Sequence, residues 1–375
     1  MRKAFKYRLY PTRQQADALA KMLETHRRLY NNALAERKTT WENEQRSVSY
    51  GDQSARLKEA RKTDSFLAQT NFSSCQATLR RLEKAFQAFF RRLKAGETPG
   101  YPRFKGANRS DTVEFPSHGD GCKFYGPRVY FQHIGQVKVK LHRPVEGTIK
   151  TLSFKREADG WHLIVSCDLG DVAATPSEKP AVGIDVGLHS FLVASDGRSV
   201  EPPQFYRKVQ RALRKAQRHL TRCQKGSTRR RKAVQRVAKL HQRVANQRRD
   251  FHHKLAHDLV QRHGLVAHEN LNVKGIARTR LAKSVHDAGW GQFLAILQHK
   301  AEEAGVQVIA VPPHNTSQVC SECGCLPDVP KTLADRSHVC PHCGYPADRD
   351  VNAARNILRL GLSRQARTST MVGVA

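Results

Sequence analysis

The sequence lacks the features of membrane and secreted proteins. No run of apolar residues reaches the length that a bilayer span needs, which excludes a transmembrane helix. The first ten residues alternate basic and apolar side chains and contain no unbroken apolar stretch, so we expect no signal peptide. These absences predict a cytoplasmic protein without a membrane partner.

Acidic residues are scarce relative to basic ones. The 375 residues include 33 Asp and Glu against 65 Lys and Arg, a formal net charge of +32 at pH 7. Self-repulsion on this scale disfavours a compact state unless a polyanion neutralises it, so nucleic acid is the expected partner. Hydrophobic residues (39%) and charged residues (26%) stay near the averages of folded proteins. The length exceeds that of one usual core and indicates two or three domains.

Disulfide bonds are not expected among the nine cysteines of a cytoplasmic protein. Two Cys-x2-Cys pairs, Cys320 with Cys323 and Cys340 with Cys343, are separated by 16 residues, which is typical of zinc ribbons. A glycine directly after each pair relieves the turn. Four thiolates leave no open coordination position, so we expect a structural Zn²⁺ ion. Cys325 is a spare thiol, because using it instead of Cys323 would break the two-residue spacing.

The chain alternates between helical and strand-like patterns. A helical block ends near residue 105, where Gly and Pro interrupt it, and its clearest apolar stripe is expected to pack while the Arg and Lys beside it meet phosphate. Residues 112–169 have a period of two and predict a small antiparallel barrel or sheet, which the strand-like residues 1–10 could join. The helical block would then be an insertion. The stripe consists of Cys75, Leu79, Leu82, Phe86, Phe89 and Leu93.

The strongest electrostatic feature lies between Arg207 and Arg249, with 17 Lys and Arg and no Asp or Glu. Its helical apolar spacing, interrupted at Gly226-Ser227, predicts a hairpin of two long helices over residues 205–262. Solvated helix faces usually mix charges, and this one does not. We therefore expect salt-sensitive, sequence-tolerant contacts with a phosphate backbone. The expected contacts are Arg207, Lys208, Arg211, Arg214, Lys215, Arg218, Arg222, Arg229, Arg230, Arg231 and Lys232.

Three carboxylates predict a second kind of metal site. Asp185 lies within one apolar strand, Glu269 ends another, and Asp350 opens a helix. Taken alone, each of these acids is more simply interpreted as a helix cap or a surface charge. Strand, strand and helix start in this order, however, is the RNase H-like arrangement. Hard oxygen ligands suit Mg²⁺ or Mn²⁺, which can activate a water for phosphodiester hydrolysis.

The chain resembles the TnpB-type proteins, which are transposon-encoded RNA-guided endonucleases related to type V CRISPR effectors. The matching segments cover nearly the whole chain in order. They are Tyr10-Pro11, Gly100-Tyr-Pro-Arg-Phe-Lys105, Gly183-Ile-Asp-Val-Gly187, His268-Glu269-Asn-Leu271, Asp287-Ala-Gly-Trp-Gly291, the four zinc cysteines and Asp348-Arg-Asp-Val-Asn-Ala-Ala354.

The resemblance implies an α/β multidomain protein with an RNase H-like (RuvC) nuclease domain. Its expected parts are a wedge-like β-barrel at 1–10 and 106–178, a helical recognition insert at 11–105, the nuclease at 179–313 and 347–361, a zinc ribbon at 314–346, and a disordered tail at 362–375. The family's catalytic acids fall on Asp185, Glu269 and Asp350. Asp348 competes with Asp350, and we interpret it as a helix cap or a supporting residue.

The resemblance also implies a guide RNA, a double-stranded DNA target beside a short flanking motif, and one nuclease centre in a monomeric ribonucleoprotein of the bacterial cytosol. Candidates for reading the flanking motif are Tyr50, Gln76 and Ser117, although each reads more simply as a surface polar residue; Gln can pair bidentately with adenine. Two alternatives stay open: an RNA-guided DNA binder that regulates without cutting, and a strand-transfer transposase.

Overall fold

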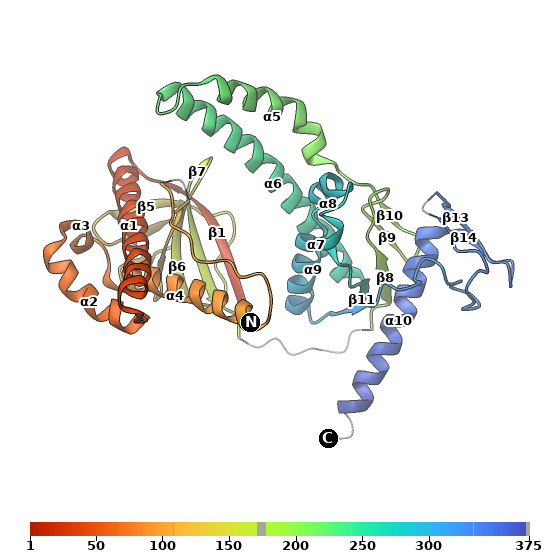
Figure 1. Cartoon of the computed structure of the whole chain (residues 1–375). Coiled ribbons are helices and arrows are strands. Elements are labelled where there is room, and N and C mark those ends of the chain that lie inside the picture. Colours follow the sequence, from red (N-terminus) through yellow and green to blue (C-terminus); the bar gives the residue numbers. More distant parts are fainter. Residues whose placement is uncertain (108, 171–177, 333, 373–375) are drawn as a thin grey trace. The chain divides into compact units, whose positions relative to one another are not determined.

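The computed structural model describes residues 1–107, 109–170, 178–332 and 334–372. The chain divides into two compact units, residues 1–171 and 172–375 (Figure 1). The expected domain boundary at residue 178 borders the segment 171–177, which lies outside the described residues. No helix in the described ranges combines the length and apolarity that crossing a membrane requires.

The first unit is built on a seven-stranded antiparallel sheet with the order β2-β6-β7-β1-β5-β4-β3. Strand β1 pairs with β7 on one side and β5 on the other, so the first ten residues lie in the middle of this sheet. The four helices of the unit therefore interrupt one sheet in sequence. The strands are β1 (Arg2–Tyr10), β2 (Thr112–Phe115), β3 (Cys122–Phe124), β4 (Arg128–Phe131), β5 (Gly135–Lys140), β6 (Thr148–Glu157) and β7 (Gly160–Asp168).

This sheet is curled but open, which corrects the expectation of a closed barrel. Strands β2 and β3 are its two edges, and they are not paired with each other in the described residues. Strands β4 and β6 are separated by three other strands, yet the rings of Phe131 and Phe154 lie 5.5 Å apart. Phe115 of β2 also contacts Phe131 at 5.8 Å. The sheet thus wraps half around an aromatic core, because right-handed twist accumulates along seven strands.

Four helices cover this unit, and their apolar residues form a second core. The stripe on α4 is buried from Cys75 to Phe86, but Phe89 is only half-buried and Leu93 is exposed. The expectation that the whole stripe packs is therefore wrong for its last turns, which no helix or strand among the described residues of the first unit buries. The helices are α1 (Arg13–Glu44), α2 (Tyr50–Thr63), α3 (Ser65–Ala68) and α4 (Phe72–Lys94).

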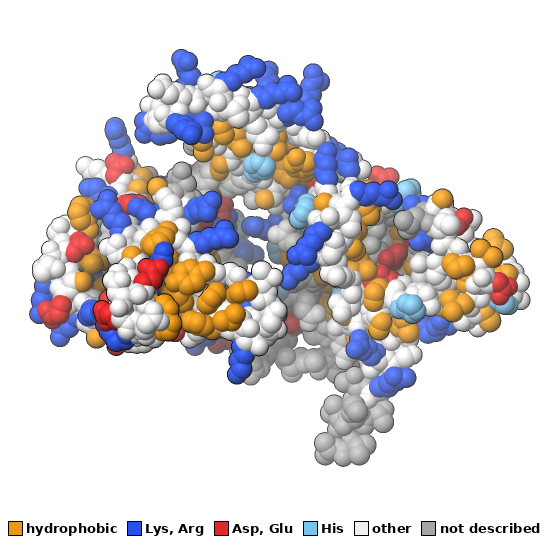
Figure 2. Space-filling model, viewed as in Figure 1, with side chains coloured by type: hydrophobic (Ala, Val, Ile, Leu, Met, Phe, Trp, Pro, Cys, Tyr) orange, Lys and Arg blue, Asp and Glu red, His pale blue; other side chains and the backbone are white. Residues whose placement is uncertain are grey.

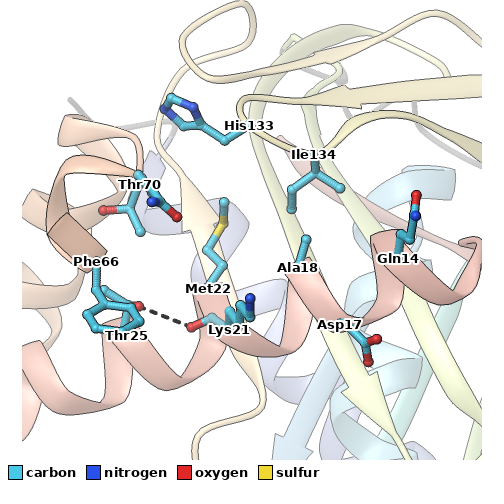
Figure 3. Close-up of a pocket in the computed structure, with 11 residues that line it drawn as sticks. Gln14, Asp17, Ala18, Lys21, Met22, Thr25, Phe66, Thr70, His133 and Ile134 are labelled. Carbon is cyan, nitrogen blue, oxygen red and sulfur yellow. Dashed lines mark hydrogen bonds between the residues drawn. The ribbon is translucent and has the colours of Figure 1, made fainter.

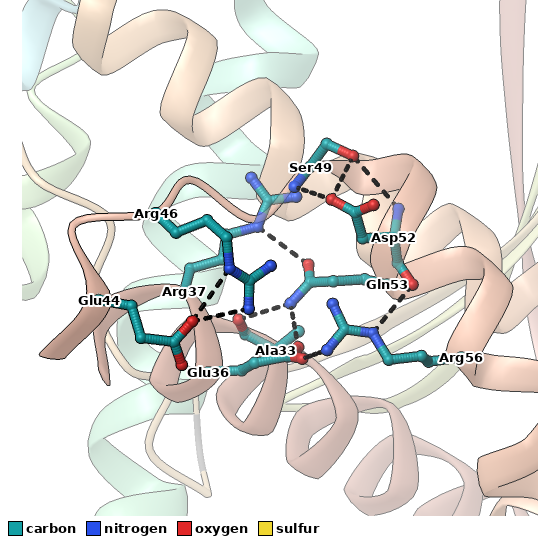
Figure 4. Close-up of polar contacts among 9 residues, drawn as sticks. All are labelled: Ala33, Glu36, Arg37, Glu44, Arg46, Ser49, Asp52, Gln53 and Arg56. Carbon is teal, nitrogen blue, oxygen red and sulfur yellow. Dashed lines mark hydrogen bonds and ion pairs between the residues drawn. The ribbon is translucent and has the colours of Figure 1, made fainter. Parts of the chain in front are cut away.

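A buried amide joins α1 to α2 (Figure 4). The Nε2 group of Gln53 donates to the carbonyl oxygen of Ala33 at 2.8 Å and to Glu36 at 2.7 Å, while its Oε1 accepts from Arg37 Nε at 2.9 Å. Arg37 also donates to Glu83 of α4. The amide of Gln53 is fully used in this network, so a shift of one helix against another would leave buried polar groups without partners.

The second unit contains a five-stranded sheet with the order β10-β9-β8-β11-β12. Strands β8, β11 and β12 are parallel, while β9 and β10 continue the sheet antiparallel. The strands are β8 (Ala181–Asp185), β9 (Leu192–Ala194), β10 (Ser199–Val200), β11 (Leu265–Glu269) and β12 (Gln307–Val311).

Helices cover both faces of this sheet. Val266 faces a core shared with α6 (Thr228–Arg262) and α9 (Trp290–Ala304), whereas its neighbours Leu265 and Ala267 face Ile357 of α10 (Arg349–Val372). The alternation follows from the two-residue repeat of a strand. A strand that is buried on both faces needs apolar residues at every position, and residues 265–267 are accordingly all apolar.

Helices α5 (Phe205–Arg222) and α6 form an antiparallel pair that extends from the sheet (Figure 1). Helix α5 has no side-chain cap of its own. Asp287, in the short helix α8 (Ala282–Ala288), accepts from the backbone amides of Tyr206 at 2.8 Å and Arg207 at 3.1 Å instead. Arg248 of α6 donates to the carbonyl oxygen of Asp287. One buried acid therefore ties the base of the pair to the body of the unit.

The expected disordered tail is wrong for residues 362–372, which continue α10. The extension lies along β12: the guanidinium of Arg364 donates to the carbonyl oxygen of Ala310, and Gln365 Nε2 donates to Gln307 Oε1 at 2.8 Å. Two of the polar side chains in this stretch, Arg364 and Gln365, thus reach a neighbouring strand. Two further short strands, β13 (Ser337–Val339) and β14 (Pro346–Asp348), precede α10.

Candidate active site and nucleic-acid surfaces

Two of the predicted acids lie at the carboxyl ends of adjacent parallel strands. Asp185 is the last residue of β8, not its middle as the sequence suggests, and Glu269 is the last residue of β11. Ile184 is paired with His268, so the two acids follow one register pair and leave the sheet at the same edge. Ligand sites in open α/β sheets are found at this edge.

The third acid is brought to this edge by close packing of α10 on the sheet. A Cβ on Gly183 would collide with the carbonyl oxygen of Ala354 and lie 2.6 Å from the backbone nitrogen of Leu358. A Cβ on Gly361 would lie 2.5 Å from the Cβ of Ala267 in β11. Glycine at both contacts lets the helix backbone touch the strands directly. Asp350, in the first turn of the helix, is thereby held near Asp185.

Asp185 lies close enough to Glu269 and Asp350 for the charges of both to act on it. Burial, together with the negative charges of Glu269 and Asp350, raises the pKa of Asp185 to about 7, while the nearby Arg349 opposes this rise. Burial also raises the pKa of Glu269. Like charges gathered in a partly desolvated place are costly unless a cation compensates them. The donor set, hard carboxylate oxygens from three elements, fits Mg²⁺ or Mn²⁺.

Asp348 caps α10, which confirms the interpretation of this residue as a cap. Its Oδ1 accepts from the backbone amides of Asp350 at 2.8 Å and Val351 at 3.1 Å. Such bonds satisfy amides that a helix start leaves without a partner. The carboxylate of Asp348 is thus used by the helix backbone.

Two buried asparagines and one threonine link this site to the cysteine cluster, and sequence reasoning missed all three. Thr316 donates its hydroxyl to Glu269 Oε1. Asn356 Nδ2 donates to the carbonyl oxygens of Thr316 at 2.9 Å and Val319 at 2.7 Å. Asn352 accepts from the amide of Ser321 at 2.8 Å and donates to Val319. The available signal was two Asn four residues apart on the apolar face of α10, where buried amides need specific partners.

The four predicted zinc ligands converge. Their sulfur atoms all lie within 4.8 Å of one another, with Cys320 and Cys343 at 3.8 Å and Cys323 and Cys340 at 3.5 Å. Tetrahedral coordination with Zn–S bonds of about 2.3 Å needs sulfur separations of about 3.8 Å, so the set fits zinc. Cys325 is exposed and is not part of this group.

Two turns of the same design hold these cysteines. The amide of Gly324 donates to the carbonyl oxygen of Cys320 at 3.0 Å, and that of Gly344 donates to Cys340 at 2.9 Å. Both glycines have positive φ, +77° and +71°, which explains the requirement for glycine. The amide of Cys320 also donates to the carbonyl oxygen of Cys325, so the spare cysteine closes the first turn through its backbone.

The basic residues predicted to contact phosphate on the α5–α6 pair are exposed, with one exception. Figure 2 shows Lys and Arg side chains along this pair. Arg230 is half-buried, and its Nη1 donates to the carbonyl oxygens of Leu220 and Cys223, both at 3.1 Å. It caps the end of α5 through this nitrogen, and its contact with phosphate stays a prediction. The exposed set is Arg207, Lys208, Arg211, Arg214, Lys215, Arg218, Arg222, Arg229, Arg231 and Lys232.

Two of the three candidates for reading a flanking motif lie on adjoining helices. Gln76 of α4 donates to the hydroxyl of Ser54 in α2 at 3.0 Å, and the guanidinium of Arg80 lies 5.5 Å from the ring of Tyr50. Tyr50 and Gln76 are both half-buried, so each presents part of its side chain. Ser117 is exposed in the loop after β2.

The first unit holds a cavity and a cluster of titratable groups, both apart from the carboxylates and cysteines described above. The cavity, of about 390 Å³, lies beside α1, and its lining includes Lys21, Phe66 and His133 (Figure 3). In the cluster, Glu157 and Asp159 approach His162 at the β6–β7 turn, but Lys6 and Arg8 already pair with these acids at 2.7 and 2.8 Å. We therefore interpret this cluster as a network of ion pairs.

Comparison with protein families identifies three matching regions. Residues 164–280 match the family described as "Probable transposase", residues 290–357 the "Cas12f1-like, TNB domain", and residues 1–46 a "Helix-turn-helix domain". In the structure, residues 1–46 form β1 followed by the single helix α1.

Solved structures resemble the fold over most of the chain. A complex described as Cas12f1 with single-guide RNA and target DNA matches with a TM-score of 0.57 and 16% identity, covering 92% of this chain and 83% of that one. The mini-RNA-guided endonuclease CRISPR-Cas_phi3 matches with a TM-score of 0.51 and 9% identity, covering 96% and 92%. The α/β multidomain fold is thus of the Cas12f kind.

Two relatives in sequence are similar over nearly the full length, and a third over part of it. The "Putative RNA-guided DNA endonuclease" of Streptomyces pristinaespiralis is 34% identical over 98% of this chain and 91% of its own. The "Putative RNA-guided DNA endonuclease InsQ" of Escherichia coli K12 is 30% identical over 96% and 92%. The TnpB-like protein L770 of Acanthamoeba polyphaga mimivirus is 25% identical over 60% and 46%. These matches confirm the resemblance seen in the sequence, and the chain belongs to the TnpB family of transposon-associated RNA-guided DNA endonucleases.

Proposed function

We propose that this protein is an RNA-guided DNA endonuclease, acting as a monomer with a guide RNA on double-stranded DNA beside a short flanking motif. The names of its full-length relatives and the guide-RNA and DNA complex of its structural neighbour support this activity. The net charge of +32 is the electrostatic counterpart of two nucleic-acid partners. We place RNA-guided binding without cutting and strand transfer behind it, because all three acids of a nuclease centre are present.

The observation that supports the proposal is that Asp185 and Glu269 end adjacent parallel strands at one sheet edge, where the charge of Asp350 also acts on Asp185. We assign this unit as an RNase H-like (RuvC) nuclease domain whose three carboxylates hold Mg²⁺ or Mn²⁺. A bound divalent ion would activate water and stabilise the leaving oxygen of a phosphodiester. The protein's own contribution is placement: α10 fixes Asp350, and the Thr316 hydroxyl orients Glu269.

The remaining elements have supporting roles in this proposal. The four cysteines hold a structural Zn²⁺ ion, and the segment around them is anchored to α10 by Asn352 and Asn356. The exposed cations of α5 and α6 hold phosphates without reading bases. The curled sheet serves as the wedge-like domain and the helices at 11–105 as its recognition insert, with Tyr50 and Gln76 toward the flanking motif.

The test is cleavage of a plasmid by the protein purified with its own RNA, in buffer containing Mg²⁺. We expect Asp185→Asn to abolish cutting while RNA binding is kept and the melting temperature does not fall, because the variant removes a buried charge that its neighbours disfavour. Asp250→Asn is the matched control, because Asp250 is an exposed acid on α6 of the same unit and loses the same charge. Equal cutting by the Asp185 variant and the unmodified protein would remove the proposed site.

A further inference from the structure

The apolar stripe of α4 runs out of the core and forms an aromatic surface of its own. Leu82 is fully buried and Phe86 is 9% exposed, but Phe90 is 57% exposed and Leu93 is 56% exposed. Tyr101, which follows α4 in sequence, is 46% exposed. Figure 2 shows hydrophobic side chains gathered over α4. Contiguous exposed apolar surface of this kind marks an interaction site.

Four rings make this surface rigid. Phe86 contacts Phe90 at 6.3 Å and Tyr101 at 5.7 Å between ring centroids. Phe89 contacts the same two rings at 5.2 and 5.4 Å. The two inner rings thus hold the two outer ones, mostly through edge contacts, which leaves part of each outer ring for a partner. Rings fixed in this way lose little conformational entropy when something stacks on them.

The segment that carries Tyr101 is anchored at its far end to α1. The backbone carbonyl of Lys105 accepts from Arg27 Nη1 at 2.8 Å and from Asn31 Nδ2 at 3.0 Å, while its amide donates to Asn31 Oδ1 at 2.8 Å. The Lys105 ammonium lies 4.3 Å from the centre of the Tyr30 ring. Between the two anchors, Phe104 is 52% exposed. An extended segment held at both ends therefore presents its aromatic residues to solvent.

The charge around the rings is positive. The last turn of α4 and the segment that follows it carry the exposed cations Arg91, Arg92, Lys94 and Arg103 against one exposed acid, Glu97, and none of these cations takes part in an ion pair within the described residues. Rings interleaved with unpaired cations are the combination that binds single-stranded nucleic acid, because bases stack on the rings and phosphates meet the cations. A second copy of this chain fits poorly, since it would bring like charges together.

We propose that this surface, formed by Phe90 and Tyr101 with the surrounding cations, binds unpaired nucleotides of an RNA strand by stacking. The inference rests on the proposed function for the presence of RNA, and it assigns to α4 and residues 99–105 a contact with bases. It predicts that an RNA bound here contains at least one nucleotide outside a duplex.

The test measures binding of two RNA probes to the full chain freed of nucleic acid. The probes are a single-stranded oligouridine and an RNA duplex of the same length, compared at one fixed high salt concentration so that phosphate contacts do not dominate. Phe90→Leu keeps an apolar side chain and removes the ring. We expect it to weaken single-strand binding about fivefold or more, the loss of one stacked base, and to leave duplex binding unchanged.

Leu93→Gln is the matched control, because Leu93 is as exposed as Phe90 and offers no ring. Unchanged single-strand binding in this variant supports stacking. If Phe90→Leu leaves single-strand binding intact, or if Leu93→Gln weakens it equally, stacking is refuted. A protein dimer in light scattering that both variants dissociate would assign the surface to a second copy. These measurements record binding and not cleavage. They can therefore be made with Asp185→Asn protein, and their outcome does not depend on whether the nuclease assignment is right.

Discussion

Gly183 of β8 lies directly against the backbone carbonyl of Ala354 in α10. A Cβ at residue 183 would also lie 2.6 Å from the nitrogen of Leu358, so strand and helix meet backbone to backbone. The contact is two residues before Asp185 and four residues after Asp350. The absence of a side chain at Gly183 therefore sets how closely α10, which carries Asp350, approaches β8, which carries Asp185.

Gly183→Ala should force α10 away from the sheet and reduce DNA cleavage strongly. Overpacking at a site like this typically costs about 1–3 kcal/mol of stability. Thermal unfolding and cleavage are measured together. The control is Gly291→Ala in α9, where a Cβ meets no neighbour and the helix is expected to gain up to about 1 kcal/mol. Normal cleavage by the Gly183 variant would contradict the assigned packing.

Thr316→Val should slow cleavage while the fold is kept, because it removes the hydroxyl that donates to Glu269 and keeps the shape of the side chain. Loss of one hydrogen bond to a charged group costs about 1.5–3 kcal/mol, which corresponds to a rate about tenfold lower or more. Single-turnover cleavage with saturating RNA measures the effect. Thr316→Ser restores the hydroxyl and should recover most of the rate; an equally slow Ser variant would count against a role for the hydrogen bond.

Removal of zinc should disturb the acid site as well as the ribbon. Asn352 and Asn356 bind the segment 316–321, which leads into the first cysteine turn. Cys340→Ser is expected to lose bound zinc, lower the melting temperature and reduce cleavage. Cys325→Ser should retain zinc and activity, since Cys325 contributes only its carbonyl oxygen. Zinc content by elemental analysis decides between them.

Charge removal on α5 should weaken binding of nucleic acid in a salt-dependent way. The variant replaces Arg211, Arg214, Lys215 and Arg218 by Gln. The logarithm of the binding constant falls with the logarithm of the salt concentration, and we expect this fall to become less steep. The decrease in steepness is about 0.9 for each phosphate of duplex DNA that the protein no longer neutralises. Arg230→Gln behaves differently in this account, because Arg230 caps α5. It should lower the melting temperature with little change in the salt slope. Identical slopes for all variants would exclude α5 from the interface.

Acid should destabilise the first unit through His26. Burial lowers the pKa of His26 to about 4, and the ring is held neutral, with Nδ1 donating to the carbonyl oxygen of Met22 and Nε2 facing the Ser74 hydroxyl. Between about pH 6.5 and 4 the unfolded chain binds a proton that the folded chain does not, so stability falls as pH falls. The full effect is about 3 kcal/mol. His26→Gln should flatten that part of the curve of unfolding free energy against pH, and an unchanged curve would contradict the assignment.

Local pattern was sufficient for the elements whose signal lies within a few residues. The two cysteine pairs predicted their cluster because two-residue spacing and a following glycine impose one turn. The charge run predicted exposed basic helices because lysine and arginine are rarely buried without a partner. The charge run did not reveal that Arg230 caps α5, because its carbonyl acceptors belong to a different part of the chain. The apolar stripe did not reveal that Leu93 is exposed.

The sequence by itself determined which residue types would gather: the zinc ligands, the basic helices and, through the family motifs, the three acids. Only the tertiary structure decided how they are held. Gly183 against α10, Thr316 on Glu269 and Asn356 on the cysteine segment each join residues that are about 40 or more positions apart. No local preference encodes such contacts, because their free energy depends on packing and hydrogen bonding that exist only once the chain has folded.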